Sequence, residues 1–228
     1  MVTLTIDNRE IQTEDGTTIL QAARANCIAI PTLCYHEAVE PYAACRLCVV
    51  ELANARGKLV AACAQACENG MNVLTNSPRV QASRRITAEL FMASGAHLPL
   101  VQATAKALGV EHTRYSLPAN DCILCGLCVR ACDELVGAHA ISLVQRGLQK
   151  KFAPPFEITS AACIGCATCV LICPTGAITL ADLTPAPPAL LRKGAGGIGH
   201  DARTCRVCGE QSLPHRFADA EALLADSR

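Results

Sequence analysis

The sequence predicts an α+β protein made of several small units in a row. Its first 76 residues read as short strands around one helix, and residues 78–109 read as helices. A run of four cysteines follows and is repeated with the same spacing. Each copy leads into a short apolar stretch that is typical of a strand, "AISLV" after the first and "AITL" after the second. A chain of 228 residues can form one large domain or two small ones.

The first 76 residues contain the elements of a small α+β domain. "TLTID" and "EIQTE" alternate apolar and polar residues on either side of a turn near Asn8, which predicts two paired strands. "TTILQAARAN" reads as a helix, because Thr18 and Gln21 form a capping-box pattern at its start. Two further strands are expected in "CVVELANARGKLVAAC", around a turn from Asn54 to Gly57, and a last one in "MNVLT".

The following residues are expected to form a helical connector. In "NSPRVQASRRITAELFMASG", Ser77 can cap the helix, Pro78 suits its first turn and Gly95 suits its end. A second helix is expected in "LPLVQATAKALG", ending at Gly109. The apolar residues that give the first helix a rough stripe are Val80, Ile86, Leu90 and Phe91.

The charge pattern excludes some classes of partner. Lys and Arg number 20, Asp and Glu also number 20, and no long basic run occurs, so the clustered positive face of a nucleic-acid-binding protein is missing. No stretch reaches about 18 consecutive apolar residues, which argues against membrane insertion. The N-terminus shows no secretory signal. We therefore expect a soluble, cytoplasmic protein.

The sixteen cysteines are the dominant feature of the composition. In a cytoplasmic chain they are not expected to form disulfides, because reducing pools keep thiols free. Fourteen fall into groups with ligand-like spacing. The other two, Cys27 and Cys67, are expected to be ordinary thiols without a ligand role.

The runs "DCILCGLCVRACDE" and "ACIGCATCVLICPTG" each have the spacing C-x2-C-x2-C-x3-C, which is typical of iron–sulfur ligands. In two-cluster ferredoxins the fourth cysteine of such a run binds the other cluster. Two zinc ions are the alternative, but zinc sites pair C-x2-C knuckles across longer gaps. Carried onto this sequence, the ferredoxin pattern gives one [4Fe–4S] cluster on Cys122, Cys125, Cys128 and Cys173, and a second on Cys132, Cys163, Cys166 and Cys169.

The cysteines nearer the N-terminus have a different spacing, C-x10-C-x2-C-x14-C. It resembles the plant-type [2Fe–2S] pattern with a longer first gap, and the α+β elements around it would then form the β-grasp fold of such ferredoxins. A zinc ion on the same residues is the alternative. The four residues are Cys34, Cys45, Cys48 and Cys63.

Taken together, "IPTLCYHEAVEPYAACRLCVVE", "AAC" at 61–63, the connector and "CGLCVRACDE" resemble one family over residues 1–183. It is the N-terminal iron–sulfur region of the complex I 75-kDa subunit, found also in the iron–sulfur diaphorase subunit of NAD-linked hydrogenases and in NAD-linked formate dehydrogenases. The resemblance implies a subunit of a hetero-oligomer that relays electrons between a flavin subunit that oxidises NADH and a further redox subunit.

The sequence departs from this family in the connector. The family usually binds a further [4Fe–4S] cluster there through one histidine and three cysteines. His97 stands where that histidine would be, but no cysteine lies between Cys67 and Cys122. One ligand cannot hold a cubane, so we expect that cluster to be absent and His97 to be an ordinary polar residue.

The C-terminal tail carries two smaller motifs. Cys205 and Cys208, with His200 and His215, could bind zinc. A site completed by a partner and unligated thiols are the alternatives, since Ser212 stands where a third cysteine would be needed for the cluster motif of the formate dehydrogenases. "GAGGIG" at 194–199 matches a dinucleotide fingerprint only weakly, because no strand precedes it, and a hinge is expected.

The complete prediction is a β-grasp [2Fe–2S] domain at 1–77, a helical connector at 78–117, a 2[4Fe–4S] ferredoxin domain at 118–183, and a linker and tail at 184–228. The expected function is electron transfer within a multi-subunit NAD(P)H-linked oxidoreductase, with one [2Fe–2S] and two [4Fe–4S] clusters and a candidate zinc site in the tail. The alternatives are a zinc-stabilised interaction module and a self-contained ferredoxin-type reductase.

Overall fold

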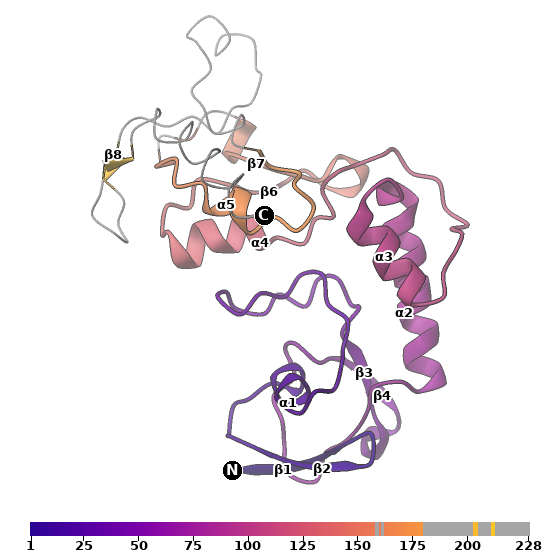
Figure 1. Cartoon of the computed structure of the whole chain (residues 1–228). Coiled ribbons are helices and arrows are strands. Elements are labelled where there is room, and N and C mark those ends of the chain that lie inside the picture. Colours follow the sequence, from indigo (N-terminus) through magenta and orange to yellow (C-terminus); the bar gives the residue numbers. More distant parts are fainter. Residues whose placement is uncertain (158–159, 161, 180–202, 205–210, 213–228) are drawn as a thin grey trace, which may run out of the picture. The chain divides into compact units, whose positions relative to one another are not determined.

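The computed structural model describes residues 1–157, 160, 162–179, 203–204 and 211–212 (Figure 1). The chain forms two compact units, one of Met1–Tyr35 with Pro41–Cys125 and the other of His36–Glu40 with the chain from Gly126 onward. Among the described residues, no helix is both long enough and apolar enough to cross a membrane. The four domain ranges drawn from the sequence stay predictions.

A five-stranded mixed sheet forms the base of the first unit, in the order β2-β1-β5-β3-β4. β1 and β5 are parallel, and the other neighbours are antiparallel. Asp7 and Asn8 both have positive φ, which gives the two-residue turn that suits the twist of the β1–β2 hairpin. The strands are β1 (Val2–Ile6), β2 (Arg9–Thr13), β3 (Val49–Leu52), β4 (Lys58–Ala61) and β5 (Asn72–Leu74), with the 3-10 turn η1 (Ala53–Ala55) between β3 and β4.

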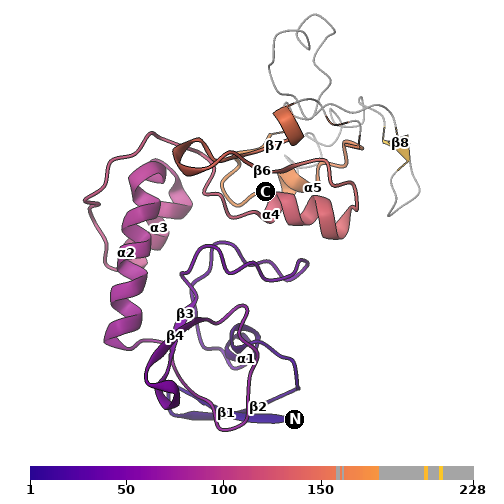
Figure 2. The ribbon, with the colours of Figure 1, turned by 180° about the vertical axis from the view of Figure 1, so that it is seen from behind.

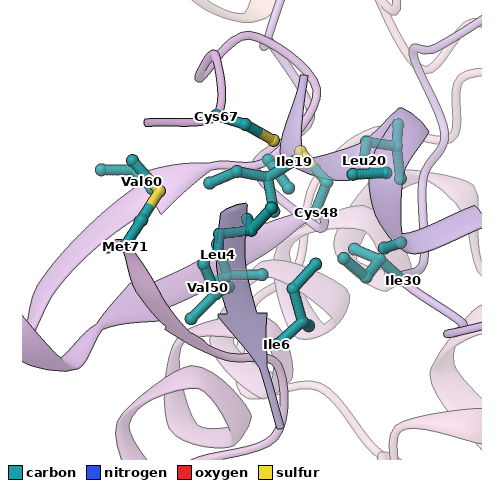
Figure 3. Packing of buried hydrophobic residues seen from close by; sticks show 14 of the residues in the cluster. Leu4, Ile6, Ile19, Leu20, Ile30, Cys48, Val50, Val60, Cys67 and Met71 are labelled. Atoms are coloured by element: carbon teal, nitrogen blue, oxygen red, sulfur yellow. The ribbon is translucent and has the colours of Figure 1, made fainter. Parts of the chain in front are cut away.

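Helix α1 (Ile19–Ala25) covers this sheet and confirms the predicted capping box. The Thr18 hydroxyl accepts a hydrogen bond from the Gln21 N–H, and the Gln21 side chain accepts one from the Thr18 N–H. Figure 3 shows side chains of β1 and α1 packed in one core with residues of the other strands. The predicted α+β architecture of the β-grasp type is therefore present. Fully buried members of the core include Leu4, Ile6, Ile19, Leu20, Val50 and Val73.

Helices α2 (Pro78–Gly95) and α3 (Pro99–Ala107) confirm the helical connector, and they pack side by side (Figures 1 and 2). The Ser77 hydroxyl accepts a hydrogen bond from the Val80 N–H, as the capping pattern predicts. The predicted apolar stripe is partly wrong, because Ile86 and Leu90 are about half exposed. The face of α2 that is buried instead carries Val80, Arg84 and Ala88, spaced by four residues.

The second unit is built from short elements around cysteines. Strand β6 (Ser142–Val144) confirms the strand predicted after the first cysteine run, and it pairs with β7 (Lys151–Ala153), which was not predicted. The strand predicted at 177–180 is wrong for residues 177–179, which are not in a strand. The other elements are α4 (Leu127–Arg130), the π-helix η2 (Ala131–Leu135), η3 (Gly147–Gln149), η4 (Pro155–Glu157), α5 (Thr168–Leu171), β8 (Arg203–Thr204) and β9 (Gln211–Ser212).

Two isoleucines offer a test of the core. Ile6 is completely buried, so the Ile6→Ala variant should lose about 2–5 kcal/mol of unfolding free energy through lost burial and the cavity left behind. The matched change Ile86→Ala, on the solvent side of α2, should stay within about 0.5 kcal/mol. Urea unfolding followed by far-UV circular dichroism measures both. Equal midpoints for the two variants would contradict the burial described here.

Candidate metal centres

The four cysteines predicted to hold a [2Fe–2S] cluster lie together in the first unit. Cys34 and Cys45 come from the long loop between α1 and β3, Cys48 directly precedes β3, and Cys63 follows β4. None of the four is more than 6% exposed. Cys34 and Cys45 share an apolar cluster with Phe91, Leu100 and Leu108 of the connector. The helical connector therefore shields this half of the site from water.

The four thiols form two pairs. The Sγ atoms of Cys48 and Cys63 are 3.4 Å apart, and the N–H of Cys45 donates to the Sγ of Cys34 over 3.4 Å. A thiol hydrogen bond from Cys34 lowers the pKa of Cys45 to about 5, and one from Cys63 lowers the pKa of Cys48 to about 7. The same bonds, together with burial, raise the pKa of Cys34 and of Cys63. Each pair thus ionises at one sulfur readily and at the second only with difficulty.

This pairing fits a binuclear cluster better than a single ion. In a [2Fe–2S] cluster each iron takes two of the four thiolates, whereas a structural zinc takes all four. Two separate thiol pairs match two irons, and binding would release the remaining thiol protons.

The backbone around the cysteines repeats an unusual conformation. In each four-cysteine run, the residue just before the second cysteine and the residue just after it have positive φ. Turns of this kind aim successive N–H groups at one point, which suits an anionic group. Glycine occupies only one of the two positions in each run. The residues are Leu124 (54°) and Gly126 (72°) in the first run, and Gly165 (66°) and Ala167 (58°) in the second.

In the second unit, four cysteines line one pocket: Cys132, Cys163, Cys166 and Cys169. They are the set predicted to hold the second [4Fe–4S] cluster. The rest of the lining is mainly small and apolar and includes Ala140, Ile141 and Ala167. The N–H of Ala140 donates to the Sγ of Cys132 over 3.3 Å, and the Thr168 hydroxyl donates to the Sγ of Cys166 over 3.3 Å. Such bonds to sulfur help to set the potential of a cluster.

Burial raises the pKa of two of these thiols, Cys169 and Cys132. It raises the pKa of Cys169 to about 12, with a further contribution from the charges of the neighbouring cysteines. The pKa of Cys132 is also raised by burial. A thiolate in this pocket therefore needs a compensating positive charge, which iron would supply. The donor set, the apolar lining and the N–H groups all fit a cluster.

The four cysteines predicted to hold the other [4Fe–4S] cluster are divided between the two units. Cys122 and Cys125 end the first unit, where Cys125 and Ile123 pack against the cluster of apolar residues that contains Cys34. Cys128 and Cys173 belong to the second unit. Burial alone would raise the pKa of Cys173, but hydrogen bonds from Thr175 and nearby N–H groups lower it below the ordinary value. The ligand set as a whole stays a prediction.

The other cysteines differ from these groups. Cys27 is exposed, and Cys67 is buried in the core of the first unit, where burial raises the pKa of its thiol. The tail residues Cys205, Cys208, His200 and His215, and the "GAGGIG" stretch, lie outside the described residues.

His97 contacts a carboxylate beside a predicted ligand. Its Nε2 lies 2.7 Å from Oδ1 of Asp121, the residue before Cys122. The same loop is fixed to the end of α2 by hydrogen bonds from the Leu117 N–H to the Ala93 carbonyl and from the Asn120 N–H to the Ser94 carbonyl. His97 therefore has a polar partner of its own in a partly exposed position.

One residue near the candidate [2Fe–2S] site was missed by the sequence analysis. Arg84 of α2 is buried, and its guanidinium donates to the backbone carbonyls of Leu47 and Val49, on either side of Cys48. The spacing of four residues from Val80 and from Ala88 is the signal that could have placed it on the buried face.

Comparisons with known proteins match both regions of the chain that contain the grouped cysteines. Residues 1–78 match a family described as a 2Fe-2S iron-sulfur cluster binding domain, and residues 121–177 match one described as a 4Fe-4S dicluster domain. A chain in the crystal structure of an NAD+-reducing [NiFe]-hydrogenase in the H2-reduced state superposes with a TM-score of 0.60 at 32% identity. The match covers 67% of this chain and 74% of the hydrogenase chain.

Curated relatives are similar over most of this chain. A subunit of an NADH-quinone oxidoreductase of Rhizobium meliloti (strain 1021) is 34% identical over 206 residues, and the HndD subunit of the NADP-reducing hydrogenase of Solidesulfovibrio fructosivorans is 35% identical over 210. Each match covers 78% of this chain. The chain spans only 24% of the first relative and 36% of the second.

Two cysteines four residues apart give a test of the [2Fe–2S] site. The Cys63→Ala variant should lose about two irons per chain, because one iron would be left with a single thiolate. The Cys67→Ala variant removes an equally buried thiol that belongs to neither pair, and it should keep the iron of the unchanged protein. Iron analysis of anaerobically purified protein compares them. Full iron in Cys63→Ala would remove Cys63 from the ligand set.

The His97→Ala variant tests the connector. It should leave the iron content unchanged, because the sequence offers no cysteines there to complete a cluster. The loss of a partly exposed ion pair with Asp121 should cost about 0–1 kcal/mol of unfolding free energy. Iron analysis and urea unfolding measure the two effects. A loss of iron from this variant would show that His97 acts as a ligand after all.

Proposed function

We propose that this chain relays electrons inside a larger NAD(P)H-linked oxidoreductase. The chain belongs to the iron–sulfur protein family that includes the Rhizobium NADH-quinone oxidoreductase subunit and a chain of an NAD+-reducing [NiFe]-hydrogenase. The observation that carries this proposal is the grouping of cysteines in two matched domains, as thiol pairs in one and around a single pocket in the other.

The proposed relay has three centres. Cys34 with Cys45 would bind one iron of a [2Fe–2S] cluster, and Cys48 with Cys63 the other. Cys132, Cys163, Cys166 and Cys169 would hold one [4Fe–4S] cluster. The final set, Cys122, Cys125, Cys128 and Cys173, would hold the second. When bound, the clusters supply one-electron redox chemistry. The chain supplies burial and hydrogen bonds to sulfur, which tune the potentials.

The chain is proposed to work with two kinds of partner subunit. A flavin subunit that oxidises NADH would stand on one side and a further redox subunit on the other, since a relay needs both a donor and an acceptor. The relatives named above act on NADH, NADP or hydrogen by their names, which supports this class of complex. We propose a cytoplasmic location and zinc as the candidate metal of the tail cysteines.

The iron content and the reduction behaviour test this function together. Anaerobically purified full-length protein should carry about ten irons per chain and should show EPR signals of [2Fe–2S] and [4Fe–4S] clusters after dithionite reduction. NADH alone should not reduce it, because the flavin subunit is absent. Zinc in place of iron would favour an interaction module, and direct reduction by NADH would favour a self-contained reductase.

A further inference from the structure

A buried arginine reaches the candidate [2Fe–2S] site from outside the predicted domain. Arg84 lies in the second turn of α2, and only 6% of its surface is exposed. Its Nε donates to the carbonyl of Leu47 over 2.9 Å, and its Nη2 donates to the carbonyl of Val49 over 2.8 Å. The planar guanidinium thus spans the backbone on both sides of Cys48.

The charge of this arginine needs an explanation. A buried cation is costly unless an opposite charge lies nearby. Among the described residues, no carboxylate forms an ion pair with Arg84, and its hydrogen bonds go to neutral carbonyls. Burial lowers the pKa of Arg84, while the charge of Cys48 and, after it, that of Asp7 raise it. Because the guanidinium lies against the backbone on both sides of Cys48, the ionised sulfur of Cys48 would be a nearby source of negative charge for Arg84.

A bound cluster would increase this negative charge. Two ferric ions, two sulfides and four thiolates carry a net charge of minus two. One electron from a reduced neighbouring centre would convert one ferric ion to ferrous and bring the charge to minus three, with no bond broken. The reduced form gains more from a nearby cation than the oxidised form does, and net charge is one of the factors that set cluster potentials.

We propose that Arg84 is a positioning residue of the [2Fe–2S] site that fixes Cys48 through its two carbonyl bonds and stabilises the reduced cluster through its charge. The inference rests on the proposed function, because it requires the cluster to be bound. It also gives helix α2 a role beyond connecting two cluster domains: the helix supplies the counter-charge of the [2Fe–2S] centre. The apolar packing of the connector around Cys34 and Cys45 keeps water from screening that charge.

Three variants separate charge from shape. Arg84→Gln removes the charge, and Arg84→Lys keeps the charge but loses the planar fork. Arg85→Gln removes the same charge from the next residue of the helix, which is exposed. The reduction potential of the [2Fe–2S] cluster is measured by anaerobic dithionite titration of the full chain. EPR is recorded at a temperature at which reduced [4Fe–4S] signals are broadened away, and iron content is measured alongside.

At the midpoint potential of the unchanged protein, Arg84→Gln should raise the ratio of oxidised to reduced [2Fe–2S] cluster on the order of tenfold. For a one-electron couple this corresponds to a midpoint potential lower by about 59 mV. Arg84→Lys should restore most of this shift, and Arg85→Gln should leave the ratio unchanged because water screens its charge. If Arg84 acted only through its shape, the three variants would not rank in this way by their shift in the cluster's potential. Equal ratios in the unchanged protein and in Arg84→Gln would overturn the proposal.

Loss of the cluster from a variant also decides the question. If Arg84→Gln binds no [2Fe–2S] cluster while Arg84→Lys binds it with a near-normal potential, the need for a positive charge is supported. If both variants lose the cluster and Arg85→Gln keeps it, shape alone matters, and the electrostatic part is overturned. Absence of iron from the unchanged protein would instead defeat the proposed function.

Discussion

The structure depends on bringing buried sulfur atoms close together, which a protein can sustain only if their charge is compensated. In the apolar pocket of the second unit, burial raises the pKa of Cys169 and of Cys132. In the first unit each thiol pair has one sulfur that ionises easily and one that does not. Iron bound to sulfide would relieve this conflict, because it binds every thiolate and neutralises about half of their charge.

The remaining architecture arranges the chain around these sulfur atoms. The mixed sheet and α1 form an ordinary apolar core, and three of its members, Cys48, Cys63 and Cys67, are cysteines. The connector contributes apolar side chains to the group around Cys34 and Cys45 and a guanidinium beside Cys48. In the second unit, cysteines with small aliphatic residues are themselves the core. Cofactor binding and folding are therefore closely linked in this protein.

Local signals in the sequence were sufficient for the helices and main strands of the first unit, but not for features that depend on distant contacts. The ligand sets drawn from the cysteine spacing stay predictions. The capping box at Thr18 and the spacing of the cysteines are local, and both were predictable. The parallel pairing of β1 with β5 and the β6–β7 pairing join segments whose partners no local pattern identifies. The exposure of Ile86 and Leu90 and the burial of Arg84 reverse the usual preferences of these residue types. The burial of Arg84 depends on distant carbonyl acceptors, Val49 of β3 and Leu47 just before that strand. The thiol pairing of Cys48 with Cys63 spans 15 residues and could not be read from the C-x2-C motif that links Cys45 with Cys48.

The left-handed residues in the cysteine runs have a consequence for how the protein matures in the cell. Leu124 and Ala167 carry side chains in a conformation that costs about 1–2 kcal/mol for residues other than glycine. A chain that has not received its clusters would lack the iron–thiolate bonds that oppose this strain, which would favour relaxation of these loops. Quality-control proteases cleave relaxed loops readily. The steady-state amount of this protein should therefore follow the cell's capacity for cluster assembly.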